Sequence, residues 1–175
     1  MISNEPVDIE KAARAVKIIA GLQRELITRI QTVGDCGPFL AAVYDREGRL
    51  IAKEANSVVQ DKCSHCHAEM NALKAAERKL DTFDLAPHHV SLYVTAEPCI
   101  MCLGGILWAG VDAVYYSVSS RRVEEITGFD EGFKSGWMSE FKKRGITVYG
   151  EIETALGEEA LRVYMQLGKK VYKPR

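Results

Sequence analysis

The chain has 175 residues, a length typical of one globular domain, so we expect residues 1–175 to form a single domain. Hydrophobic residues make up 47% of it and charged residues 27%, a balance that excludes a disordered or fibrous chain. The formal net charge is -1, so no overall positive field draws the chain to nucleic acid or to an anionic membrane. We therefore expect neither as a partner.

Targeting signals and cysteine usage bear on where the protein resides. The start of the chain, MISNEP, lacks a basic segment followed by an apolar core, and no apolar run reaches about 18 residues. Four of the five cysteines form Cys63-x-x-Cys66 and Cys99-x-x-Cys102, spacings that suit a metal better than a disulfide framework. Together these features predict a cytoplasmic protein.

The first part of the chain predicts a helix followed by a hairpin. Over residues 8–31, apolar side chains recur at three-and-four spacing, which is typical of an amphipathic helix. Residues 39–44 and 50–55 are short apolar runs, and the segment DREGR between them supplies turn chemistry. We expect two antiparallel strands here.

Further along, helices and strands alternate. Helix formers over residues 67–80 predict a helix, residues 90–95 a buried strand, residues 100–109 an apolar helix and residues 113–118 another strand. Beyond Gly128 the predicted elements are a helix over 137–144, a short apolar run over 146–149 and a helix over 153–167. Such alternation indicates an α/β fold with a partly parallel sheet.

Two short segments hold most of the chain's metal-binding side chains. CSHCHAE covers residues 63–69 and EPCIMC covers residues 97–102, and each lies at the start of a predicted helix. Thiolate is the form that binds zinc, and a helix N-terminus favours it through its positive partial charge. Pro98 fixes the turn into the second helix. Three protein ligands plus a water would make an open, catalytic zinc site.

The spacing of His67 and Glu69 restricts where a metal can lie. In the middle of a helix, residues two apart point to nearly opposite faces, so both reach one ion only if it lies beyond the N-terminal end. We expect His67, Cys99 and Cys102 to bind Zn2+ and Glu69 to move protons. Zinc lowers the pKa of a bound water to around 7, so Glu69 would take a proton from that water and deliver it to the substrate.

These residues match the His-x-Glu and Pro-Cys-x-x-Cys signature of the zinc cytidine and purine deaminases. The chain further resembles the guanine deaminase branch over roughly residues 35–135, through GPF, Asn56, TAEPC, WAG and GFDE. The resemblance implies a cytidine deaminase-like fold, a three-layer α/β/α sandwich with a central mixed sheet, and a homodimer. It also implies a nucleobase as the small-molecule substrate.

The same resemblance suggests roles for individual residues. It places Phe39 and Trp108 against the faces of the base, Asn56 on the ring's polar edge, and Glu131 as acceptor for the ring's N–H groups. In that branch the C-terminal tail, here about residues 168–175, can cover the partner's site as a lid. The candidate substrate-binding residues are Phe39, Asn56, Ala68, Trp108, Glu131 and Tyr172.

The implied reaction is hydrolysis of guanine to xanthine and ammonia, with guanosine, aminotriazines and cytosine-type rings as alternatives. The tRNA adenosine deaminases share the zinc core, but they tend to carry a smaller polar residue in place of Trp108 and lack the GFDE segment of residues 128–131.

Other interpretations of these motifs remain open at this stage. CSHCH also matches a c-type haem attachment sequence, and the two Cys-x-x-Cys pairs could form a structural zinc-binding module. If the deaminase interpretation holds, Cys63 and Cys66 flank the pocket mouth without binding metal. Trp108 could belong to the core, Asn56 could close a turn, and Glu131 could be solvated.

Overall fold

A mixed sheet with the strand order β1-β6-β5-β4-β2-β3 forms the centre of the computed structural model, which describes residues 1–34 and 36–172. Strands β4, β5 and β6 pair in parallel, whereas the remaining pairs are antiparallel. The strands are β1 (Ile2–Ser3), β2 (Leu40–Tyr44), β3 (Leu50–Ala55), β4 (Ser91–Ala96), β5 (Ala113–Val118) and β6 (Thr147–Gly150).

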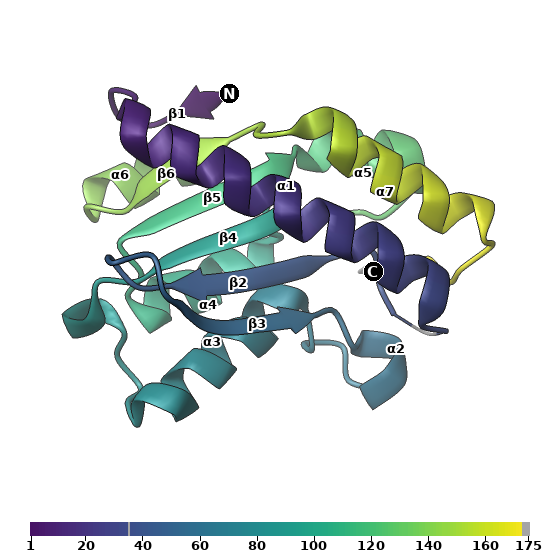
Figure 1. Cartoon of the computed structure of the whole chain (residues 1–175), viewed down its shortest axis with the longest axis horizontal. Coiled ribbons are helices and arrows are strands. Elements are labelled where there is room, and N and C mark those ends of the chain that lie inside the picture. The colour runs from purple at the N-terminus through teal and green to yellow at the C-terminus, as the bar shows by residue number, and fades with distance from the viewer. Residues whose placement is uncertain (35, 173–175) are drawn as a thin grey trace.

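Helices cover both faces of this sheet (Figure 1). One face carries α1 (Ile9–Thr32), α5 (Ser120–Thr127) and α7 (Thr154–Gln166). The other carries α3 (Ala68–Leu80), α4 (Ile100–Ala109) and α6 (Trp137–Lys143). The expected three-layer α/β/α sandwich with a central mixed sheet is therefore confirmed. A short α2 (Val58–Asp61) and a 3-10 turn (Ala86–His88) lie in the connections.

Alternation along the strands produces two cores. Successive strand residues point to opposite faces, so Tyr93 packs under α1 and α7 whereas Leu92 and Val94 pack under α3 and α4. On the first face, Tyr93, Tyr115 and Tyr149 of three adjacent strands stack with ring centroids 4.5 and 5.1 Å apart. Both helix layers are thereby fixed to the same sheet.

The boundaries of all predicted helices and strands lie within one residue of those observed, and the elements that were not predicted are short. Helix α1 begins after Asp8, whose carboxylate accepts hydrogen bonds from the N–H groups of Glu10 and Lys11. Helix α5 and the two-residue β1 were not predicted, because both are too short to show a hydrophobic period. None of the helices in the described part of the chain has the length and apolar character needed to cross a membrane.

Candidate metal centre and active site

The sheet topology brings two helix N-termini to one edge. Strands β3 and β4 are both antiparallel to β2, so they run in the same direction and their carboxyl ends lie on the same side. The chain leaves β3 toward α3, where His67 is the N-cap, and leaves β4 toward α4, where Cys99 is the N-cap. Cys102 follows in the first turn of α4. The three side chains therefore converge at this edge.

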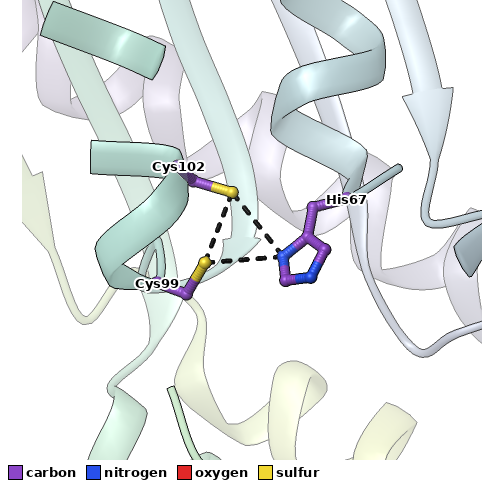
Figure 2. Close-up of side chains that lie close together, drawn as sticks. All are labelled: His67, Cys99 and Cys102. Carbon is purple, nitrogen blue, oxygen red and sulfur yellow. Dashed lines mark hydrogen bonds between the residues drawn. The ribbon is translucent and has the colours of Figure 1, made fainter. Parts of the chain in front are cut away.

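The spacing of the three side chains fits a zinc ion. His67 Nδ1 lies 3.5 Å from Cys99 Sγ and 3.6 Å from Cys102 Sγ, and the two sulfurs are 3.5 Å apart (Figure 2). With Zn–S near 2.3 Å and Zn–N near 2.0 Å, a tetrahedral ion requires N···S edges of about 3.5 Å and S···S edges of about 3.8 Å. Among the described residues, only this group of His, Cys, Asp or Glu side chains is close enough to share a metal ion.

The electrostatics of the thiols also suit a metal. The hydrogen bond with the Cys102 thiol lowers the pKa of Cys99 to about 4, and His67 lowers it as well. The same hydrogen bond, together with burial, raises the pKa of Cys102. One thiolate is thus favoured before any metal enters, and metal binding would release the second proton.

Glu69 lies beside this cluster but is not one of its ligands. It occupies the first turn of α3 and is buried, and it lines the same cavity as His67 and Cys99. Burial raises the pKa of Glu69, and the neighbouring Cys99 raises it further. A raised pKa makes the carboxylate a stronger base, which suits a group that takes a proton from water and later gives it up.

The cavity next to the cluster has a volume of about 280 Å³, at the small end of ligand pockets. Its walls include the side chains of Phe39, Phe129 and Tyr172, and the carboxyl of Glu131. Burial raises the pKa of Glu131 to about 8, whereas the Lys134 ammonium opposes this shift. A divalent cation bound nearby would act in the same direction as Lys134 and lower the pKa of Glu131.

Aromatic packing at the cavity involves one residue to which the sequence assigned no role. The ring of Phe129 meets that of Phe39 edge to face at 5.4 Å and that of Tyr172 at 5.2 Å. Phe129 belongs to the GFDE segment, so the only signal was its place two residues before Glu131. Ile100 and Met101 also line the cavity.

The expected position of Trp108 over the base is wrong for this chain's own cavity. Trp108 lies in the last turn of α4, at the opposite end of the helix from Cys99, and its side chain is 89% exposed. Nine residues of helix separate the two positions by about 13 Å. Ala68 does not line the cavity either, because it is fully buried in the core between the sheet and α3.

Asn56 and Tyr172 bind each other. The Asn56 Nδ2 donates to the Tyr172 hydroxyl at 2.7 Å, and that hydroxyl donates to Asn56 Oδ1 at 3.0 Å. The Val58 N–H also donates to Oδ1, so Asn56 additionally closes a turn after β3. Tyr172 thus lies over the cavity of its own chain, whereas the resemblance implied a tail over the partner's site. Residues 173–175 of the expected tail lie outside the described residues.

The second cysteine pair lies apart from the metal cluster. Cys63 Sγ is 3.3 Å from His65 Nε2, and the intervening Ser64 lines the cavity. Because the only candidate metal cluster among the described residues is formed by His67, Cys99 and Cys102, the geometry contradicts a structural module built from both Cys-x-x-Cys pairs.

Comparison with known families agrees with this geometry. The family described as "Cytidine and deoxycytidylate deaminase zinc-binding region" matches residues 25–118, more than half of the chain. The chain belongs to this family. The matched segment contains His67, Cys99 and Cys102, the three residues that fit a zinc ion.

Curated relatives of this deaminase family member cover part of its length. It is 38% identical over 97 residues to a guanine deaminase of Bacillus subtilis, which is 55% of this chain and 60% of that protein. It is 39% identical over 83 residues to a tRNA-specific adenosine deaminase of Aquifex aeolicus, which is 47% of this chain and 54% of that protein. The chain therefore spans little more than half the length of these two relatives.

Solved structures of the family match more of the chain. A guanine deaminase from Nitrosomonas europaea is 39% identical, with a TM-score of 0.78, over 83% of this chain and 81% of that chain. A structure in complex with 2,6-diaminopurine is 38% identical, with a TM-score of 0.81, over 88% and 82% of the two chains.

Metal analysis tests the assignment of the ligands. Cys99→Ala removes one of three protein donors, so we expect the purified variant to lose most of its zinc, measured by mass spectrometry of the metal against protein concentration. Cys63→Ala is the matched control, because this thiol lies outside the cluster, and it should retain the wild-type zinc content. Undiminished zinc in Cys99→Ala would contradict the assignment.

Proposed function

We propose that the protein is a zinc-dependent aminohydrolase, a single domain that converts guanine to xanthine and ammonia. One observation carries this proposal: two carboxyl groups, the buried Glu69 and the partly buried Glu131, line one small cavity beside the metal cluster. The guanine deaminase relatives and the related structure with a diaminopurine support the choice of substrate.

In this proposal, Glu69 moves the protons of the reaction. Zn2+ held by His67, Cys99 and Cys102 would supply the Lewis acidity that activates a water molecule. The Glu69 carboxylate takes one proton from the water and passes it to the ring nitrogen as the water oxygen bonds to the ring carbon. It then carries the remaining hydroxyl proton to the amino group, so that the C–N bond breaks, ammonia leaves and the oxygen becomes a carbonyl. Its buried position beside His67 and Cys99 allows all these transfers within one cavity.

Recognition of the base is assigned to the residues around Glu131. The Glu131 carboxylate accepts hydrogen bonds from the ring N–H and amino groups of guanine, and Phe39 and Phe129 pack against the base. For Asn56 to bind the ring, Tyr172 must release its two hydrogen bonds to the Asn56 amide. Residues 168–172 of the tail would therefore act as a lid over the cavity of their own chain.

An ammonia-release assay tests this function. Purified zinc-loaded protein should release ammonia from guanine faster than from guanosine, aminotriazines, cytosine or adenosine. Glu69→Gln keeps the shape of the side chain but removes its basicity, so turnover should fall by about 10²–10⁴-fold while zinc content is retained. Near wild-type turnover in Glu69→Gln would show the mechanism to be wrong, and no activity on guanine would refute the substrate.

A second variant tests base recognition. An unpaired buried donor on the base is costly, so Glu131→Gln should lower kcat/KM for guanine by about tenfold or more, where tenfold is about 1.4 kcal/mol. A cytosine-type ring presents fewer donors and should lose less. Zinc content and Tm should stay near wild type. The control is Glu124→Gln on the exposed side of α5. If Glu131→Gln lowered kcat/KM equally for guanine and for a cytosine-type ring, Glu131 would have a general role and not a role in recognising guanine.

We also propose that the protein is a cytoplasmic homodimer. Thiol ligands persist best in a reducing compartment, which supports the location. Helix α4 consists of apolar residues, Leu107 and Trp108 are exposed on it, and Trp108 lines the same surface hollow as the exposed Phe83. A second copy of the chain would cover this surface.

Sedimentation measurements test the dimer. Trp108→Arg places a charge in the proposed interface, so we expect a shift from dimer toward monomer at micromolar concentration. Ile9→Arg is the control, because this exposed residue lies on α1 across the sheet from α4. A wild-type protein that sediments as a monomer would rule out the dimer.

A further inference from the structure

The segment that carries Glu131 has little regular structure of its own. Residues 128–136 connect α5 to α6, and Gly128, Gly132 and Gly136 all have positive φ values. The Glu131 carbonyl accepts a hydrogen bond from the Ile100 N–H at 3.2 Å. A loop with so few backbone hydrogen bonds needs side-chain contacts to hold a carboxyl group at a fixed distance from the metal cluster.

Lys134, in the same loop, provides such contacts. Its side chain is only 9% exposed. The Nζ donates to the Pro98 carbonyl at 2.6 Å and to the Ser120 hydroxyl, and it lies 3.6 Å from Glu97 Oε1. These three partners can use all three N–H groups of the ammonium.

Glu97 extends this set of contacts on the other side. Its Oε1 accepts from the Trp137 indole N–H at 2.8 Å, and its Oε2 accepts from the Ser120 N–H at 2.8 Å. The Glu97 N–H in turn donates to the Val118 carbonyl of β5. The Lys134–Glu97 pair therefore joins the C-terminal part of the 128–136 loop and the first residue of α5 to the turn that leads into Cys99.

We propose that Lys134 is a positioning residue for base recognition, which holds the Glu131 loop against the metal-binding turn. The proposal rests on the proposed role of Glu131 in binding guanine. Exposed lysines of this chain differ from Lys134: Lys143 is 66% exposed and pairs within its own helix. The Lys134 ammonium also favours the ionised form of Glu131, the form that accepts hydrogen bonds.

Binding and kinetics of Lys134→Met test this inference in the zinc-loaded full chain. Methionine keeps the length of the side chain but removes its charge and its donors. We expect the Kd for 8-azaguanine, measured by calorimetry, and the KM for guanine to rise by about tenfold. The fall in kcat should be much smaller and zinc content unchanged. Lys134→Arg should restore much of the binding, and Lys143→Met is the exposed control.

A double variant distinguishes positioning from simple stabilisation. If Lys134 acts through Glu131, adding Lys134→Met to Glu131→Gln should weaken 8-azaguanine binding no further than Glu131→Gln alone. Equal weakening by Lys134→Met in both backgrounds would overturn the inference. So would an unchanged Kd in a Lys134→Met variant whose only defect is a lower Tm.

Hydrogen exchange provides a readout that needs neither substrate nor activity. In zinc-loaded protein without base, Lys134→Met should speed exchange in the peptide containing residues 128–136 and at the Ile100 amide. If Lys134→Met does not fold, Ser120→Ala removes one acceptor and should cause the same changes to a smaller extent. Exchange equal to wild type in both variants would overturn the inference. A wild-type protein that binds no 8-azaguanine would instead refute the proposed function, and the inference with it.

Discussion

The meeting of two helix N-termini at one sheet edge is the constraint on which the site depends. The unpaired N–H groups and the dipoles of α3 and α4 concentrate positive partial charge where His67 and Cys99 serve as caps. That field favours thiolates and carboxylates, the groups that a zinc-dependent hydrolase requires. The field exists only because β2 lies between β3 and β4 and runs opposite to both, so that both helices start on the same side.

Several acidic groups lie close together at the carboxyl ends of β3 and β4, and few positively charged side chains of the described residues lie near them. Glu69, Glu131 and Cys99 line one cavity, with the Cys102 thiol directly behind Cys99, and burial raises the pKa of both carboxyl groups. Lys134 is a buried cation whose charge acts on Glu131. A divalent metal would supply the remaining positive charge, so metal binding and the ionisation of the carboxyl groups depend on each other.

Periodicity predicted the helices and strands, and short motifs predicted the three clustered metal-binding side chains, because these depend on local sequence, whereas the three-layer arrangement came from the family resemblance. The position of Trp108 was not predictable in this way. A match to a short motif does not show where on α4 the side chain lies relative to the cavity. The Asn56–Tyr172 pair joins residues 116 positions apart, and the Lys134–Glu97 pair joins two separate loops. Hydrophobic periodicity does not predict such long-range contacts, and nothing in the sequence around Lys134 distinguishes it from a surface lysine.

The proposed choice between a free base and a nucleic acid follows from features outside the zinc core. Relatives of this chain include both guanine deaminases and tRNA-specific adenosine deaminases, so the metal cluster alone does not distinguish the substrates. A polynucleotide requires a basic surface and an open path to the metal. This chain instead has a net charge of -1, and Tyr172 lies over a cavity of about 280 Å³ that also contains the Glu131 carboxyl. A second carboxylate beside the metal would repel phosphates but would bind the N–H groups of a small polar ring.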